Sequence, residues 1–488
     1  MKQDERFTVA FFLECQHGAF PWNIDEELKF VPKVPEEMKR AETNMEARAE
    51  PVTTARANLL DTFRIIKTVI TPTIAKGVIK RRPSMEALAQ RRDLDAKAVR
   101  LMQRLRKKYG NGPLLVPLPF RPQLLLLDPH HVAEALEGTP IPFTPASKEK
   151  RSALAHFEPG NVLISNASRR AELRPLHEHA LATHERVHPF VEHFDHIVRE
   201  ELQALFPLAD TGVRYVSWDE FSQSWFRIVR RIVLGNGARE DEQLTNELDD
   251  LRRRANWAFV ALTNKGKLKS YQKRVAEYLR HPELGSLISR LPNRAEVEPE
   301  SQVAQWLFAF DAAGIATFRA LALLGCQPDE QAMAVEEADA AAVDRPFARA
   351  VLIDAVRLWP TTPAILRELT EDHIIGGRTI RKGTGIIIFA PFFHRDDERL
   401  DIADRMSPAT WLDTESKPSE GLVPFSGGAA ICPAHNLVPM VASLAMGAIL
   451  SKAAISIVEP SLDPEQLPGS LDHFDIKIRL SNRQSAAA

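Results

Sequence analysis

Apolar residues recur every three to four positions along most of this chain, which is the spacing of helices that bury one face. The segments with this spacing are 59–79, 87–108, 130–136, 191–206, 218–234, 246–262, 268–278, 303–324 and 437–450. A further helix is expected from Arg169, where Asn166 or Ser168 has the side chain of an N-cap. The pattern predicts a mainly helical protein.

Shorter apolar runs predict a few strands between these helices. They lie at 9–13, 114–118, 124–127 and 386–388. A hairpin is expected around the glycine pair 376–377, and the stretch 142–166, which contains a Pro-Gly pair, is expected to be a loop. The predicted fold class is mainly α with small β-sheets, an α+β fold. Residues 1–55 are polar and proline-containing, so we expect an irregular N-terminal extension before a single domain at 56–488.

Composition and charge narrow the class of protein. The chain has 488 residues, 44% hydrophobic and 26% charged, which is enough for a large core. Its net charge of -2 provides no general basic field, so nucleic acid is not an expected partner. Three cysteines suit a reducing compartment, and no secretory signal is recognisable, so we expect a cytoplasmic protein. Charges interrupt the apolar run 59–79, which predicts a helix on the protein body with at most peripheral membrane contact.

The stretch 424–435, followed by the apolar run 437–450, has the pattern of a cysteine ligand loop that leads into a helix. Backbone N–H groups at a helix start stabilise a thiolate at Cys432, and Gly427 and Gly428 allow a tight turn around it. A buried apolar cysteine is the plainer alternative. Zinc is a second alternative, because Cys432 and His435 form a Cys-x-x-His pair, although the remaining cysteines supply no matching pair.

The spacing Phe-x-x-Gly-x-x-x-Cys-x-Ala, formed by Phe425, Gly428, Cys432 and Ala434, resembles the haem-ligand signature of the cytochrome P450 superfamily. The resemblance implies the triangular fold of that family and a single haem-thiolate domain. It also implies haem b (iron protoporphyrin IX) with the Cys432 thiolate as the proximal ligand of its iron.

The helix predicted at 303–324 contains a second resemblance to the same family. Ala313, Gly314 and Thr317 match its Ala-Gly-x-acid-Thr segment, but Ala316 occupies the acidic position, which puts the family's proton relay in doubt. From helical geometry alone, the Thr317 hydroxyl is placed to bond the carbonyl of Ala313. A glycine inside a helix indicates close approach by something large at Gly314. Asp311 is off the face of Thr317 and is not expected to replace the acid.

Asp354 and Arg357 resemble the family's Glu-x-x-Arg pair, with Asp in place of Glu. Three residues apart on a helix, they share a face and are expected to form a buried, architectural ion pair, although such a pair is more often a surface salt bridge. In the family a later arginine completes a triad, but the matching stretch, 408–411, contains Thr410 and no arginine.

Three arginines are expected to bind the haem propionates. Arg170 and Arg174 are four residues apart and so share a helix face, although a solvated basic face remains an alternative for each. The resemblance adds Arg367, and it places Ala430 where the family often has a basic residue.

The resemblance also implies a substrate pocket and an activity. Residues expected to face the substrate are Phe310, Thr362, Ala364 and Ile365. The expected function is insertion of an oxygen atom from O2 into an apolar or amphipathic small molecule. Electrons are expected from a separate ferredoxin or flavodoxin-type donor with its reductase, since no fused reductase domain is recognisable. A peroxide-using or isomerising haem-thiolate enzyme and a non-catalytic haem sensor or ligand-binding protein remain alternatives.

Overall fold

The computed structural model describes residues 55–118, 121–206, 212–258, 261–340, 342–412 and 419–483, all within one compact unit, Thr53–Ala488. The predicted strand at 9–13 and all but the last residue of the predicted extension 1–55 lie outside these described residues. Helices dominate the described chain and three small sheets accompany them, so the predicted α+β class is confirmed.

The helices of the described chain mostly follow the predicted apolar segments. In order they are α3 (Leu59–Ile65), the π-helical η2 (Ile66–Ile70), α4 (Thr71–Lys76), α5 (Pro83–Arg92), α6 (Leu94–Tyr109), α7 (Pro129–Glu137), α8 (Lys148–Leu154), α9 (Ala167–Ala180), α10 (Val191–Leu202), α11 (Trp218–Leu234), α12 (Glu242–Ala255), α13 (Lys265–Arg280), α14 (Pro299–Gly325), α15 (Pro328–Asp339), α16 (Pro346–Leu358), α17 (Ala390–His394), α18 (Ala409–Leu412) and α19 (Leu437–Leu450).

The strands form three separate sheets. They are β1 (Leu114–Val116), β2 (Gln123–Leu125), β3 (Phe143–Thr144), β4 (Val213–Ser217), β5 (Ala364–Leu369), β6 (His373–Ile375), β7 (Arg378–Ile380), β8 (Gly385–Phe389), β9 (Ala453–Glu459) and β10 (Lys477–Asn482). The largest sheet has the order β1-β2-β8-β5-β3, and the others are β4-β10-β9 and the predicted hairpin β6-β7. Within the largest sheet β5 pairs antiparallel with β8, which places Ile365 opposite Ile388.

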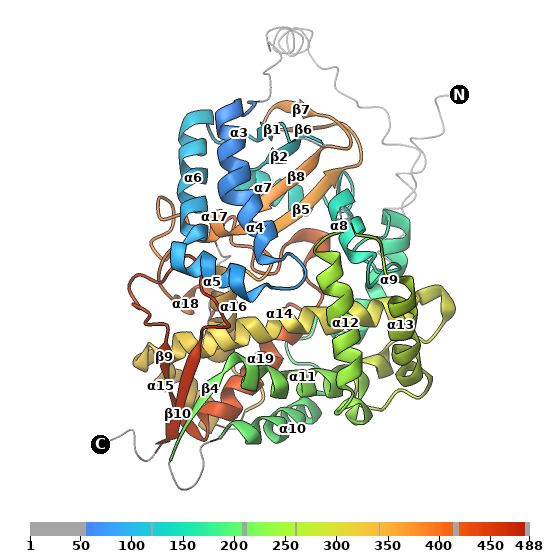
Figure 1. Ribbon diagram of the computed structural model, residues 1–488, viewed down its shortest axis with the longest axis vertical. Helices are drawn as coiled ribbons and strands as arrows, with labels where there is room; N and C mark the ends of the chain where they lie inside the picture. Colours follow the sequence, from blue (N-terminus) through green and yellow to red (C-terminus); the bar gives the residue numbers. More distant parts are fainter. Residues whose placement is uncertain are drawn as a thin grey trace, which may run out of the picture. The chain divides into compact units, whose positions relative to one another are not determined.

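The long apolar helix α14 is the centre of the larger hydrophobic core. It packs against α11, α16 and α19, and Figure 1 shows it crossing the helical part, with the five-stranded sheet to one side. Its last residue, Gly325, lies against β9, where an added Cβ would be 2.8 Å from the backbone nitrogen of Ile457. A second core lies around the five-stranded sheet with α6 and α7. The fold thus holds α14 between helices that the sequence places far apart.

Some elements differ from the sequence prediction. The single helix expected at 87–108 is two helices, because Asp93 has a left-handed backbone (φ 44°) that breaks the hydrogen-bond ladder. The loop expected at 142–166 contains β3 and α8, and α15 was not predicted at all. The helix expected at 246–262 is displaced to Glu242–Ala255 because Asp241 caps it earlier by accepting from the Leu244 amide. The cap at Asn166 is confirmed, and α9 continues through its proline.

Among the described residues, α14 is the one helix that is long and apolar enough to cross a membrane. Most of its hydrophobic window is buried by other parts of the protein. A buried core helix passes the same test of length and composition.

Candidate haem-thiolate site

Cys432 lies in a tight loop that is closed by its own backbone. The Cys432 N–H donates to the carbonyl of Phe425 at 2.9 Å, and the Cys432 carbonyl accepts from the N–H of His435 at 3.1 Å. Phe425 and Cys432 are both partly buried against the larger core. The loop therefore presents the sulfur from a fixed backbone, with Phe425 beside it.

The helix that follows begins later than the sequence suggested. It starts at Leu437, five residues after Cys432, so the thiol is not at the helix N-terminus itself. Burial raises the pKa of the Cys432 thiol, while the backbone N–H of Ala434 and the charge of Arg174 act in the opposite direction. A thiolate here depends on a cation bound to the sulfur, as a metal ligand does.

Zinc is not supported at this loop. His435 Nδ1 lies 3.0 Å from the Cys432 carbonyl oxygen, so the ring is engaged with the backbone. Throughout the part of the chain that the structure describes, no three His, Cys, Asp or Glu side chains form a group that could hold a metal ion. A structural zinc site needs four such ligands.

Gly428 is required by a contact with helix α7. Its φ of +59° is left-handed, and an added Cβ would lie 1.9 Å from the carbonyl oxygen of Leu136. The Cys432 loop thus packs directly on the C-terminal turn of α7. The sequence prediction attributed this glycine to turning alone, whereas the structure adds close approach by Leu136.

Two buried arginines hold the same loop from opposite parts of the chain. Arg170 on α9 donates to the carbonyl of Ala429 at 3.1 Å, and Arg367 on β5 donates to Ser426 Oγ at 3.2 Å. Arg367 also donates to Thr139 Oγ1 at 3.1 Å. Two of the arginines predicted to contact haem are therefore brought to the loop that carries the predicted iron ligand.

These arginines carry charge that the surrounding protein does not neutralise. Among the described residues, no carboxylate lies within ion-pair distance of Arg170 or Arg367, and burial lowers the pKa of each to about 10. The third predicted arginine, Arg174, is paired with Glu178 at 2.6 Å. Buried cations ordinarily have a partner anion, so Arg170 and Arg367 fit a ligand with carboxylates, as haem has in its two propionates.

Lys150 on α8 adds a cation that sequence reasoning missed. Burial lowers its pKa to about 7, and the charges of Arg367 and Arg170 act in the same direction. The side chain was missed because 142–166 was taken for a loop, whereas Lys150 lies on α8, close enough to both arginines for their charges to act on its pKa. Three mutually repelling cations strengthen the fit to a dianion.

The hydrogen bond predicted between Thr317 and Ala313 on α14 is confirmed. Thr317 Oγ1 donates to the Ala313 carbonyl at 2.8 Å, and Thr317 is fully buried. The large group beside Gly314 is Trp225 of α11, because a Cβ on Gly314 would lie 2.6 Å from Trp225 Cδ1. Trp225 Nε1 also donates to the carbonyl of Phe310 at 2.7 Å. Gly314 therefore admits an indole ring from outside α14.

Asp311 lies in a cluster of ion pairs. It is therefore not available to replace the acid that the sequence lacks at Ala316. Its Oδ2 accepts from Arg252 Nη2 at 2.5 Å and lies 3.7 Å from Lys80 Nζ. Burial alone would raise its pKa, but the two cations lower it to about 2. Asp311 thus stays ionised and faces α12 and the segment after α4.

The expected buried ion pair is present. Asp354 and Arg357 are both fully buried, with Nε to Oδ1 at 2.5 Å and Nη2 to Oδ2 at 3.1 Å. Asp354 also accepts from the backbone N–H of Ser407 at 2.7 Å and from Trp411 Nε1 at 3.0 Å. The segment that lacks the expected arginine therefore supplies two other donors to Asp354, the backbone N–H of Ser407 and the indole N–H of Trp411.

Arg357 ties this pair to the segment that precedes the cysteine loop. Its guanidinium donates to the carbonyls of Ile402 at 3.0 Å and Arg405 at 2.6 Å. A bidentate pair that also binds backbone carbonyls fixes a chain segment lacking regular structure. This agrees with an architectural role.

The residues predicted to face substrate are dispersed between the two cores. Phe310 is buried in the core around α14, and Ile365 is buried in the core around the five-stranded sheet. Ala364 is half-buried at the start of β5, and Thr362 is exposed. Arg81 donates to the carbonyl of Thr361, which attaches the segment after α4 to this start of β5.

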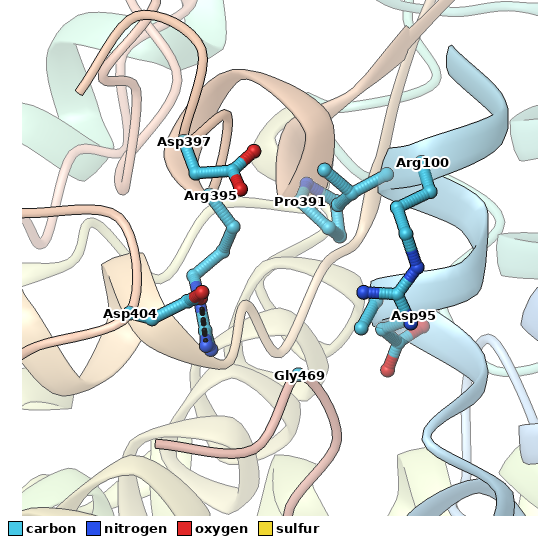
Figure 2. A pocket seen from close by; sticks show the side chains of 9 residues that line it. Asp95, Arg100, Pro391, Arg395, Asp397, Asp404 and Gly469 are labelled. Carbon is cyan, nitrogen blue, oxygen red and sulfur yellow. Dashed lines mark hydrogen bonds and ion pairs between the residues drawn. The ribbon is translucent and has the colours of Figure 1, made fainter. Parts of the chain in front are cut away.

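Two small cavities in the described part of the chain contain none of the predicted site residues. The first, of about 40 Å³, lies between α6, the end of α17 and Gly469, and Figure 2 shows its charged lining. Three of the charged residues that line it are already paired, since Arg395 binds Asp404 at 2.6 Å and Asp95 binds Lys76 at 2.7 Å. The second cavity, of about 20 Å³, is lined by Arg319 and Pro363 among others and has room for about one water molecule. Neither is a candidate active site.

Comparison with known proteins points to one family. The family described as cytochrome P450 matches residues 313–470, which include Thr317, the Asp354–Arg357 pair and Cys432. A bifunctional cytochrome P450/NADPH–P450 reductase from Bacillus cereus is 30% identical over 171 residues, covering 32% of this chain and 16% of that protein. Cytochrome P450 82A2 from Glycine max is 32% identical over 124 residues, covering 24% and 23%. The mitochondrial 1,25-dihydroxyvitamin D(3) 24-hydroxylase of Mus musculus is 26% identical over 141 residues, covering 29% and 26%. Each alignment spans less than a third of the relative's length.

Proposed function

We propose that the chain, whose residues 313–470 match the cytochrome P450 family, is a haem-thiolate monooxygenase that inserts an oxygen atom from O2 into an apolar or amphipathic small molecule. The observation that carries this proposal is the Cys432 loop held by Arg170 and Arg367, two buried cations without a carboxylate partner in the described chain. We further propose haem b as the cofactor and residues 56–488 as one haem-binding domain.

In this proposal each residue of the loop has a distinct task. Cys432 supplies the thiolate ligand, and its backbone bond to Phe425 fixes the direction of the sulfur. Arg170, Arg367 and Lys150 bind the propionates and lose their mutual repulsion on doing so. Bound haem with a thiolate ligand would supply the activation of dioxygen.

On the distal side, Thr317 is the residue that holds a proton. Its hydroxyl donates to the Ala313 carbonyl, and rotation about Cα–Cβ redirects it towards a bound polar group. Ala316 holds no proton, and Asp311 stays ionised in its cluster with Arg252. Protons would therefore reach Thr317 through water.

The electron donor is proposed to be a separate ferredoxin or flavodoxin-type protein with its reductase. The relative from Bacillus cereus bears an NADPH–P450 reductase in its name, so a reductase of that kind is the competing donor class. Steady-state reduction of the haem by each purified donor, compared at equal concentration, separates the two. We retain a cytoplasmic location as part of the proposal.

A carbon monoxide difference spectrum tests the proposed function most directly. The reduced protein reconstituted with haem is expected to show the red-shifted absorption of a thiolate-ligated complex, and product formation is expected to depend on O2 and a reductant. A thiolate spectrum without any reductant-dependent turnover over a broad panel of apolar molecules would contradict the monooxygenase assignment while leaving the haem site intact.

A second candidate function rests on Ala316. A haem-thiolate enzyme that uses peroxide or isomerises its substrate needs no proton relay to bound dioxygen, so the missing acid favours it. Turnover with hydrogen peroxide alone, at a rate that added reductant does not increase, would select this candidate.

A further inference from the structure

Helix α9 ends in a turn that places an alanine in an unfavourable backbone conformation. Ala182 has a left-handed backbone, with a φ of 48°, in a region that favours glycine. The N–H groups of Ala182 and Thr183 donate to the carbonyls of His179 and Glu178 at 3.3 Å and 2.9 Å, so the turn binds carbonyls at the end of α9. Strain of this kind is found where the local structure serves a neighbouring group. The neighbouring group here is the side chain of Thr183.

Thr183 contacts the segment that follows Cys432. It is 2% exposed, and its hydroxyl donates at 2.6 Å to the carbonyl of Pro433, the residue directly after Cys432. Asn436 Nδ2 in turn donates to the carbonyl of Thr183 at 3.0 Å. The two bonds run in opposite directions between the same two segments. They therefore fix the segment 433–436 to the end of α9.

Asn436 makes this contact although its position offers a different bond. It is the N-cap residue of α19, where an asparagine side chain ordinarily accepts from the first amides of the helix. Within the described chain its side chain makes no capping bond and donates to Thr183 instead. The link between the end of α9 and the Cys432 loop thus takes the place of an ordinary helix cap.

The Cys432 loop is held from α9 on both sides of the sulfur. Arg170 on α9 donates to the carbonyl of Ala429, three residues before Cys432. Thr183, just after α9, donates to the carbonyl of Pro433, one residue after it. Because both contacts come from one helix and its terminal turn, they fix the position of the loop with respect to that helix.

The peptide group between Pro433 and Ala434 connects Thr183 to the sulfur. This peptide bond is trans, so its C=O and N–H point in opposite directions. The C=O accepts from Thr183, and the Ala434 N–H bonds to the Cys432 side chain, where it opposes the effect of burial on the pKa of the thiol. A donor on the C=O of a peptide group polarises that group and strengthens its N–H as a donor. Thr183 therefore acts on the sulfur through one peptide group.

We propose that Thr183 is a positioning residue for the iron ligand, an inference that rests on the proposed haem-thiolate function. By donating to the Pro433 carbonyl, Thr183 fixes the peptide group and strengthens the Ala434 N–H that faces the Cys432 sulfur. The sulfur then donates less electron density to the iron of bound haem, because a hydrogen bond draws charge from a thiolate. Since reduction adds one electron to the haem, weaker donation by the sulfur favours the reduced form.

The reduction potential of the full-length, haem-loaded protein tests this proposal. It is measured as a one-electron equilibrium with a redox dye of known potential, with dithionite as the reductant. Thr183→Val replaces the hydroxyl with a methyl group. This variant is expected to lower the equilibrium constant for reduction by about two- to fourfold, because each bond in a chain strengthens the next by about 10–30%. Thr183→Ser keeps the hydroxyl and is expected to retain the wild-type value.

The carbonyl stretching frequency of the reduced carbon monoxide complex is a second readout, which a merely structural role of Thr183 would not change. A more electron-rich thiolate lowers this frequency, so Thr183→Val should lie below the wild type and Thr183→Ser should match it. The matched control is Thr73→Val. Thr73 is also buried, and its hydroxyl donates to the carbonyl of Val69 at 2.7 Å, but it lies on α4, far from Cys432 in sequence. The control should keep both values.

Equal potentials and equal carbonyl frequencies in wild type, Thr183→Val and Thr183→Ser would overturn the proposal. An equal shift in Thr73→Val would overturn it as well. If the valine variant does not bind haem, Thr183→Ala is measured in its place, because that substitution only removes atoms. A wild-type protein without the red-shifted carbon monoxide band would contradict the proposed function itself. A normal band with unshifted potentials in the Thr183 variants contradicts the role of Thr183 alone.

Discussion

The indole N–H of Trp411 donates to Asp354 Oδ1 at 3.0 Å, on a carboxylate that already forms a bidentate pair with Arg357. Removing this donor in Trp411→Phe leaves a buried, charged acceptor with one partner fewer. We expect the free energy of unfolding to fall by about 1.5–3 kcal/mol, as for other hydrogen bonds to charged groups. Urea denaturation measures it, and Trp257→Phe, at an exposed indole, is the matched control.

Substitution of Cys432 is expected to remove the thiolate ligand and spare the fold. Cys432→Ala deletes one half-buried sulfur, while the backbone bond from residue 432 to Phe425 remains. The red-shifted carbon monoxide absorption should vanish, and the far-ultraviolet circular dichroism should stay that of the wild type. Cys326→Ala, which removes the other described free thiol, should keep both signals. An unchanged red-shifted band in Cys432→Ala would assign the ligand elsewhere.

Haem retention is expected to depend on Arg367 far more than on a surface arginine. Arg367 is 2% exposed and has only neutral partners in the described chain, whereas Arg253 is exposed and paired with Asp250. Arg367→Ala should weaken haem binding by about ten- to a hundredfold, since a charge-assisted hydrogen bond contributes about 1.5–3 kcal/mol. Titration of apoprotein with haem measures this. Equal dissociation constants for Arg367→Ala and Arg253→Ala would remove Arg367 from the site.

Thr317→Ala is expected to uncouple reductant consumption from product formation. The variant loses the hydroxyl that bonds the Ala313 carbonyl and that we propose to hold a proton. Peroxide released per reductant consumed should rise, whereas Thr317→Ser should stay close to the wild type. Loss of a general acid lowers the reaction rate by about 10²–10⁴-fold in comparable cases, so we expect a large fall in the rate of product formation. Unchanged coupling in Thr317→Ala would favour the peroxide-using or isomerising alternative.

Acid destabilisation is expected to involve Asp311. Its pKa is lowered from 3.8 to about 2, so its contribution to stability is complete above the unfolded-state pKa and is lost as the pH falls through that range. The difference in unfolding free energy between wild type and Asp311→Asn should therefore shrink by about 2 kcal/mol between about pH 5 and about pH 2.

The sequence predicted correctly the features that depend on residues close together in the chain. The boundaries of α11 and α7 follow from apolar spacing, the cap at Asn166 from its side chain, and the Thr317 to Ala313 bond from helical geometry. The loop around Cys432 was recognisable because its residues lie within a dozen positions. The break at Asp93 was not predicted, since an aspartate in a left-handed conformation leaves no pattern in apolar spacing.

Contacts between distant segments could not be predicted in this way. The partner of Gly314 is Trp225, and the added partner of Asp354 is Trp411. Lys150 comes within electrostatic range of Arg170 and Arg367 only after three separate elements pack together. Each depends on tertiary packing, which the order of residues in a single sequence does not reveal. The charge cluster was the most consequential omission, because it supplies the physical reason for a dianionic ligand.

The contact between Gly428 and the carbonyl of Leu136 also bears on the order in which the protein assembles. These residues lie far apart in the described chain, so the contact closes a very long loop and is costly in entropy until much of the intervening structure has formed. The Cys432 loop is therefore expected to reach its final shape late in folding. Cofactor capture would then follow collapse of the helical core, and stopped-flow refolding should show haem uptake lagging behind the gain of helical signal.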